Sequence, residues 1–228
     1  MFNSPRAAFL GGVQTIIPLL LAVLPFGLVV GVISAEIGLS AAEAIGMTVF
    51  VFAGVAQLVA FQLIEENAAL WVIVLSAAVV NLRHVIYSAS LSPYFKSLSM
   101  GWKLILSYLL VDQTYALAMA HYDEYPDEPY KEWYYLGLGS LISVSWIGAM
   151  IVGFFVGAVI PSSWSLNFVV PVMFLGLLVR AIKGFPYLAA ARVAATVALL
   201  GVDFPHNLGL ITAILSGIIT GALLEREA

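Results

Sequence analysis

Long runs of apolar residues with few charges dominate this chain and constrain its fold more than any other feature. A helix needs about 20 consecutive apolar residues to cross the hydrocarbon core of a bilayer. Only 10% of the residues are charged and 62% are apolar, whereas soluble domains carry about 25% charged residues to maintain a polar exterior. The sequence therefore predicts an all-α, polytopic integral membrane protein, built as a bundle of membrane helices.

About eight apolar segments are long enough to cross or enter a bilayer. None of the loops between them is long enough for a soluble domain, so we expect a single transmembrane domain over residues 1–228. What precedes the first segment is short and polar, and we expect that segment to be retained. The segments are Phe9–Ala35, Ala44–Ile64, Ala69–Leu91, Trp102–Ala120, Leu136–Ile160, Phe168–Ile182, Tyr187–Val202 and Leu208–Leu224.

The few charged loop residues suggest two alternative topologies. Positive residues favour cytoplasmic loops, so Arg6 predicts a cytoplasmic amino terminus. Plain crossings by all segments would place Lys96 and Lys103 outside, against this rule. If one of the first two segments enters and returns without crossing, both lysines lie inside. The acidic loop from His121 to Glu132 is then predicted outside.

If one of the fifth and sixth segments also enters and returns without crossing, the two halves of the chain have opposite orientations. The possible half-repeats are residues 1–125 and 130–228. A Gly-x-x-x-Gly pattern at Gly27–Gly31 recurs at Gly153–Gly157, which agrees with a repeat. Inverted repeats with broken or re-entrant helices are the plan of many transporters. Plain crossings without a repeat remain the alternative.

Polar residues cluster within the third segment, where ionisable groups are costly and mark function by default. Helical spacing places Asn81, His84 and Ser88 on one stripe, and Arg83 and Tyr87 on the adjacent one. An arginine midway along a span needs an anion or several carbonyls as partners. It indicates either a site for a substrate carboxylate or a proton, or a structural arginine that joins helices.

A second polar group, Asp112, Gln113 and Thr114, lies in the fourth segment. Counted from the loop at Ser97, Asp112 and Arg83 lie at similar distances along their two segments. In an antiparallel hairpin they reach similar depth, so we expect them to be able to pair. A pair would offset the desolvation of both charges, and a buried structural ion pair stays open beside a functional one.

Glycine and proline predict breaks in two segments. Gln57 lies one turn after Gly54 in the second segment and indicates either a substrate contact or an interhelical hydrogen bond. Pro25 and Gly27 interrupt the first segment, where a break or a simple kink is expected. A break exposes backbone groups, and these can bind ligands where they line a cavity.

The main enzyme signatures are absent, and we expect the protein not to be an enzyme. No Gly-rich phosphate loop with Lys, no His-Glu-x-x-His and no Gly-x-Ser-x-Gly occurs. Cysteine is absent, and two of the three histidines, His121 and His206, lie at loop edges. We therefore expect no metal site and no cofactor. The lack of a basic patch predicts no binding to nucleic acid.

Four motifs, taken in order, resemble the AzlC family of branched-chain amino acid permeases. The resemblance covers nearly the whole chain, although the later segments agree mainly in length and apolarity. Its most specific part is Asn-Leu-Arg-His followed by Tyr-Ser-Ala-Ser-Leu. The motifs are Leu24–Gly27, Val51–Gln57, Asn81–Leu91 and Asp112–Thr114.

This resemblance implies a multi-pass exporter of leucine, isoleucine and valine in the inner membrane of a prokaryote. It implies a small membrane partner of the AzlD type and transport driven by proton-motive force. In the family an acidic residue often follows the aspartate of the fourth segment. This chain has Gln113 there, which leaves Asp112 as the only carboxylate of that span and speaks against a two-carboxylate proton relay.

Our interpretation is a transporter subunit that exports branched-chain or other hydrophobic amino acids across a lipid membrane. Arg83 suits the substrate carboxylate, while Asp112, Gln57 and broken-helix carbonyls suit its ammonium group. Asp112 or His84 is the candidate for proton coupling. Two alternatives are a membrane-embedded enzyme that uses His84 and Asp112 on a lipid substrate, and a structural membrane subunit.

Overall fold

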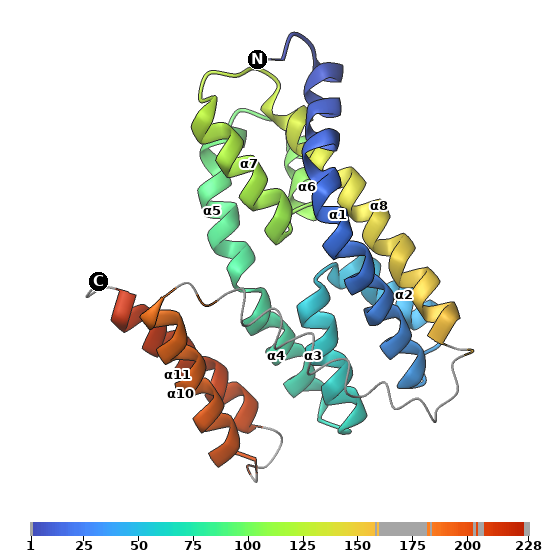
Figure 1. Ribbon diagram of the computed structural model, residues 1–228, viewed down its shortest axis with the longest axis vertical. Coiled ribbons are helices and arrows are strands. Elements are labelled where there is room, and N and C mark those ends of the chain that lie inside the picture. Colours follow the sequence, from blue (N-terminus) through green and yellow to red (C-terminus); the bar gives the residue numbers. More distant parts are fainter. Residues whose placement is uncertain are drawn as a thin grey trace. The chain divides into compact units, whose positions relative to one another are not determined.

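The computed structural model describes residues 2–157, 159, 182, 184–202, 204 and 208–225. Within these ranges all regular secondary structure is helical, as Figure 1 shows, and the predicted all-α fold is confirmed. The helices are α1 (Pro5–Glu36), α2 (Ala41–Val51), α3 (Gly54–Glu65), α4 (Leu70–Asn81), α5 (Arg83–Phe95), α6 (Met100–Tyr108), α7 (Asp112–Glu124), α8 (Lys131–Gly157), α10 (Phe185–Leu200) and α11 (Leu208–Glu225).

Four helical stretches in the described residues are long and apolar enough to cross a membrane. The other helices are shorter, and several come in pairs that together make up one apolar segment of the sequence. The predicted sixth segment, Phe168–Ile182, lies almost wholly outside the described residues, as do Lys183, Asp203 and Arg226. The four long stretches are Pro5–Glu36, Leu70–Phe95, Lys131–Gly157 and Leu208–Glu225.

The chain divides into two compact units. The first contains Met1–Gln57 and Ala78–Ile160, and the second contains Leu58–Ala77 and Pro161–Ala228. Each unit is therefore built from two separate stretches of chain. These units do not coincide with the proposed half-repeats 1–125 and 130–228, so a repeat of those halves stays a prediction.

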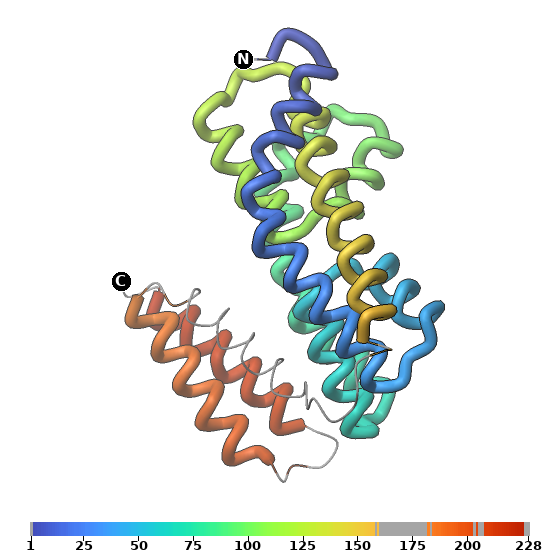
Figure 2. The backbone as a smooth tube through the Cα atoms, turned by 45° about the vertical axis from the view of Figure 1, so that its right-hand side comes forward, coloured from blue at the N-terminus to red at the C-terminus, as the bar shows by residue number. Residues whose placement is uncertain are grey.

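Helices α1 and α8 form the core of the first unit and run side by side (Figure 2). A Cβ atom on Gly12 would collide with the carbonyl of Tyr134, and one on Gly31 with the carbonyl of Met150. The contact positions advance together along both helices, so α1 and α8 are parallel. Glycine permits this close approach of the two backbones.

The glycine pattern that suggested a repeat lies in these two parallel helices, and the inverted-repeat hypothesis itself stays a prediction. That hypothesis matched Gly27–Gly31 with Gly153–Gly157, and helices related by an inverted repeat must run in opposite directions. Instead, a Cβ on Gly153 would meet the backbone of Leu28, which places the two glycine patterns against each other in parallel helices. The recurrence reflects a shared packing surface.

Helix α1 is continuous through Pro25 and Gly27, so of the two expected outcomes, a break or a simple kink, the structure shows no break. Pro18 and Pro25 both lie inside the helix. A proline removes one backbone donor and normally kinks or breaks a helix. Here the long contact with α8 holds the helix in register across both prolines. Gly27 serves this packing, because a Cβ there would press on the side chain of Ala149.

The second apolar segment is interrupted between α2 and α3. Ser40 and Glu43 form a reciprocal capping box that starts α2. At the other end Phe52 adopts a left-handed conformation with φ 44° and ψ 37°, and α3 begins two residues later at Gly54. The side-chain amide of Gln57 donates to Thr48 Oγ1 at 2.9 Å across this interruption. The break predicted at Gly54 is confirmed.

The fourth apolar segment turns back, which the sequence reasoning missed. The start of α6 lies against the start of α8, where Trp102 and Trp133 pack at 5.0 Å. The end of α7 lies there too, since His121 stacks on Tyr134 at 4.0 Å. The hairpin therefore enters and leaves at the same end of the first unit.

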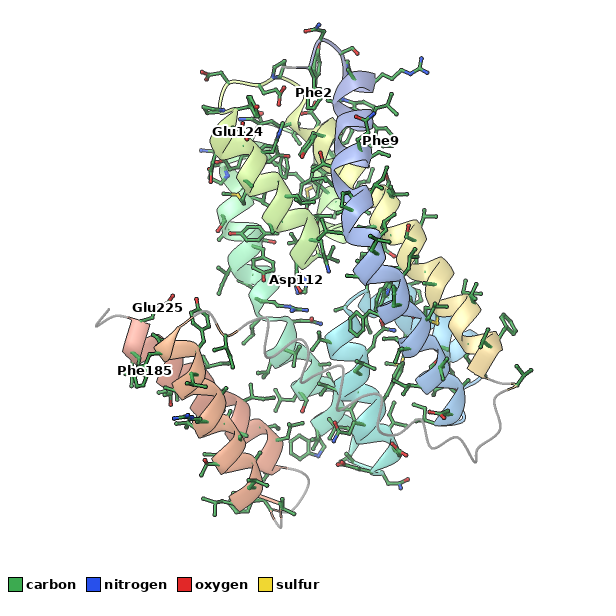
Figure 3. All side chains as sticks on the ribbon, viewed as in Figure 1. Phe2, Phe9, Asp112, Glu124, Phe185 and Glu225 are labelled. Atoms are coloured by element: carbon green, nitrogen blue, oxygen red, sulfur yellow. The ribbon has the colours of Figure 1, made fainter. Side chains whose placement is uncertain are left out.

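This hairpin places the acidic loop at the amino-terminal end of the unit. The amide of Phe2 donates to Glu128 Oε1 at 2.7 Å, and in Figure 3 Phe2 and Glu124 lie at the same end. The prediction that the amino terminus lies inside and the loop outside is therefore wrong, because the two lie on one side. The error followed from treating Trp102–Ala120 as a crossing.

The second unit contains the antiparallel hairpin of α10 and α11. A Cβ on Gly217 would meet Ala194, and one on Gly221 would meet Ala190, so the contact positions move in opposite directions along the two helices. Leu63, Val72 and Ile211 form a buried apolar cluster in this unit.

Candidate functional site

Two interrupted helices bring opposite charges together within the first unit. The stretch α4–α5 is interrupted at Leu82, so that Arg83 is the first residue of α5. The α6–α7 hairpin turns before Asp112, the first residue of α7. Arg83 Nη1 lies 2.8 Å from Asp112 Oδ2. The pairing expected from their matched depth is confirmed.

The pair lies deep relative to one end of the unit. Helices α5 and α7 each contain 13 residues, which at 1.5 Å per residue span about 20 Å. Figure 3 shows Asp112 at the opposite end of α7 from Glu124. A bilayer core is about 30 Å thick, so a site about 20 Å from one face of it would lie within the core.

The start of α7 favours the carboxylate of Asp112, because a helix N-terminus carries a partial positive charge. Arg83 pairs with this carboxylate. The side chains of Arg83 and Asp112 are 30% and 41% exposed, respectively, so the pair is open on one side rather than sealed in a core.

Several polar atoms at this site are buried without a hydrogen-bond partner among the described residues. They are Arg83 Nε, Asp112 Oδ1 and Asn81 Oδ1. Buried polar groups in native proteins are nearly always paired. One unpaired donor and two unpaired acceptors around a single ion pair are available to hydrogen-bond a polar ligand or water.

Aromatic rings flank the ion pair. Tyr87 of α5 stacks on Tyr115 of α7 with centroids 4.1 Å apart. His84 meets Tyr87 edge-on at 5.9 Å, and His84 Nδ1 lies 3.1 Å from the carbonyl oxygen of Asn81. Asn81, Arg83, His84 and Tyr87, predicted on two adjacent stripes, thus lie around one site.

Thr114 fixes the shape of the break before α7. Its side chain is fully buried, and its Oγ1 accepts from the amide of Val111 at 3.0 Å and contacts the carbonyl of Leu109 at 3.0 Å. Its hydroxyl is thus engaged with the backbone that positions Asp112. Gln113 is half-buried, and its side chain forms no hydrogen bond with any described residue.

Gln57 and Thr48 form a separate buried polar pair in the same unit. Gln57 is fully buried, and while its amide nitrogen donates to Thr48, its Oε1 has no partner among the described residues. No described hydrogen bond joins it to Arg83 or Asp112. Its place in a substrate path therefore stays a prediction.

Trp146 of α8 lies next to the break between α2 and α3 and was not identified from the sequence. Its ring packs 5.3 Å from Phe26, and a Cβ on Gly54 would collide with it. Its indole Nε1 is buried without a partner in the described part of the chain. Thr48 was also not identified from the sequence. It precedes the break by the same number of residues by which Gln57 follows it.

No group of three or more His, Cys, Asp or Glu side chains suitable for a metal occurs in the described ranges. The described residues therefore do not contradict the expectation of no metal site, and this expectation stays a prediction. The chemistry available at the Arg83–Asp112 site is ion pairing, hydrogen bonding and proton uptake.

The family profile described as AzlC protein matches residues 18–160, which include every residue of this site. The chain belongs to the AzlC family. This confirms the resemblance seen in the motifs from Leu24 to Thr114. No solved structure matches the chain.

Relatives extend over nearly the whole sequence and are named as membrane proteins. Inner membrane protein YgaZ of Escherichia coli is 24% identical over 95% of this chain and 89% of its own length. An uncharacterized membrane protein of Helicobacter pylori strain J99 is 28% identical over 92% and 93%, respectively. One from Archaeoglobus fulgidus is 26% identical over 94% of both chains. Together with the four long apolar helical stretches, they identify this chain as a membrane protein.

Proposed function

We propose that the protein is a secondary transporter subunit that exports hydrophobic amino acids, branched-chain ones above all. The observation that carries the proposal is the Arg83–Asp112 ion pair, which lies deep in the first unit and leaves Arg83 Nε and Asp112 Oδ1 without partners. A zwitterionic amino acid brings one carboxylate and one ammonium group. Its carboxylate complements the guanidinium of Arg83, and its ammonium group requires acceptors such as backbone carbonyls.

Coupling to protons follows from competition within this pair. The substrate carboxylate takes Arg83, and Asp112 then loses its cationic partner. A carboxylate without such a partner in an apolar site favours its protonated form. Binding of substrate thus promotes proton uptake at Asp112, which couples the flux of the amino acid to the flux of protons. His84, beside the pair, is the second candidate for the proton.

We further propose that the protein resides in the inner membrane of a prokaryote and works with a small AzlD-type membrane partner. Transport is favoured over enzymatic chemistry because the polar groups at this depth form an ion pair rather than a nucleophile with its base. A purely structural subunit leaves the unpartnered atoms of Arg83, Asp112 and Asn81 without a use.

The test is leucine flux in proteoliposomes that contain the purified protein, alone and together with the small partner. We expect flux of leucine, isoleucine and valine that an imposed proton gradient accelerates. A hydrophilic amino acid of similar size, such as asparagine, serves as the control substrate and is expected to move much more slowly. Absence of amino acid flux in both preparations contradicts the proposal.

A further inference from the structure

A cavity of about 280 Å³ opens between α5, α6 and the start of α8 in the first unit. We refer to it as the lysine groove, because Lys96 and Lys103 lie on its walls. Its size is at the lower end of the range for small-molecule sites, which suits one amino acid rather than a peptide. The ion-pair site described above does not include these residues.

The groove combines positive charge with hydroxyl groups. Besides the two lysines it is lined by Ser88, Ser92 and Ser107. Lys103 Nζ donates to the carbonyl of Lys96 at 2.9 Å, which holds the two lysines together at the turn between α5 and α6. Neither lysine forms an ion pair with an acidic residue in the described part of the chain.

The groove also has an apolar wall and leads toward the ion pair. Leu91, Leu106 and Leu110 are buried along it. From the lysines to Ser88 and Leu110 the helices descend by seven or eight residues, about 10–12 Å. Leu110 precedes Asp112 by two residues, and Ser88 lies one turn beyond His84.

We infer that the lysine groove is the entry site for substrate, where a hydrophobic amino acid binds before it reaches Arg83 and Asp112. The lysines attract its carboxylate, the serines accept and donate hydrogen bonds along the descent, and the leucines contact its aliphatic side chain. This inference rests on the proposed function and deepens it, because it assigns a first recognition step to residues outside the ion-pair site.

An anionic phospholipid fits the groove less well. Its phosphate would meet Lys96 and Lys103 at the interface, but its acyl chains would then lie against Ser88 and Ser107, deeper in the groove. Hydroxyl groups at that depth favour a polar ligand or water over hydrocarbon. A free amino acid has small charged groups and a short apolar part. It can therefore contact both the polar wall and the apolar wall of the groove.

The experiment measures binding in the groove independently of transport. Ser92→Cys places the only thiol of the chain on the groove wall, and its labelling by a maleimide is followed in proteoliposomes with leucine present or absent. We expect leucine to slow labelling several-fold. Leucinamide, which lacks the carboxylate, is expected not to protect, and adding Lys96→Gln with Lys103→Gln is expected to abolish protection by leucine.

Control variants and the lipid composition separate the alternatives. Arg6→Gln removes an exposed positive charge from the same end of the unit without touching the groove, so protection by leucine should persist. In transport, Lys96→Gln with Lys103→Gln should raise KM for leucine about 10-fold at an unchanged maximal rate. Protection with no leucine flux would sink the proposed function but keep the entry site.

Two results would overturn the entry site. One is unchanged labelling with leucine, whether or not flux is present. The other is protection that requires phosphatidylglycerol, rather than leucine, when vesicles with and without this lipid are compared.

Discussion

The backbone amide of Phe2 donates a 2.7 Å hydrogen bond to Glu128 Oε1, which fixes the amino terminus against the acidic loop. The ring of Phe2 also stacks at 5.7 Å on His121, whose Nε2 lies 2.5 Å from Glu128 Oε2. Arg6, Lys96 and the acidic loop thus lie at one end of the first unit. Because positive residues dominate the orientation rule and acidic ones contribute little, we expect this end to face the cytoplasm.

Cysteine labelling tests this orientation cleanly, because the natural chain contains no cysteine. We expect Glu124→Cys to react with a membrane-impermeant maleimide only after the cells are permeabilised. Ala42→Cys, exposed at the start of α2 and therefore at the far end of α1, is the matched control and should react in intact cells. The reverse pattern would contradict the assignment of this end to the cytoplasm.

The close contact of α1 with α8 predicts a large difference between two glycines of one helix. A Cβ on Gly153 would collide with the backbone of Leu28, whereas one on Gly148 meets open space. We expect Gly153→Ala to destabilise the protein by about 1–3 kcal/mol through overpacking. Gly148→Ala should leave the melting temperature in detergent unchanged or raise it slightly. Equal melting temperatures for the two variants would argue against the parallel α1–α8 contact.

The hydroxyl of Thr114 predicts a second stability difference. Thr114→Val keeps the shape of the side chain but leaves the partly buried amide of Val111 without its acceptor. An unsatisfied buried group costs about 1–3 kcal/mol, and we expect a corresponding fall in the midpoint of denaturant unfolding. Thr114→Ser retains the hydroxyl and should stay close to the natural protein. If both variants unfold alike, the break before Asp112 does not depend on this hydrogen bond.

The sequence allowed the charged pair to be predicted but not the topology around it. Arg83 and Asp112 lie at similar distances from the loop at Ser97, and in neighbouring helices that spacing alone fixes similar depth. Gly54 marked the break between α2 and α3 because glycine is a common signal for one. These inferences depend on local residue types, which a sequence records directly.

The break between α6 and α7 carried a subtler signal. Leu109, Leu110 and Val111 include neither glycine nor proline, so the fourth segment looked like one continuous crossing. The available hint was Asp112 followed by Thr114, since short polar residues favour helix starts. Conversely, Pro25 indicated a break that the contact between α1 and α8 prevents. Such tertiary contacts join residues more than 100 positions apart, and no local pattern reports them.

Arg83 allows a direct distinction between a structural and a functional ion pair. The pair is open on one side, with 30% and 41% of the two side chains exposed, so we expect Arg83→Gln to insert and fold with little loss of yield in detergent. We expect its leucine flux to fall at least 10-fold, because the substrate carboxylate loses its cation. Normal flux in this variant would refute both roles, and a loss of folded protein would favour the structural one.

Asp112→Asn in proteoliposomes tests the account most directly, because asparagine mimics the protonated carboxyl group. With leucine on both sides and no gradient, we expect this variant to retain exchange of labelled leucine. With an imposed proton gradient, the natural protein should accumulate leucine, whereas Asp112→Asn should show no response to the gradient. Full gradient-driven accumulation by Asp112→Asn would contradict the claim that the Arg83–Asp112 pair couples the amino acid to the proton, and would transfer that role to His84.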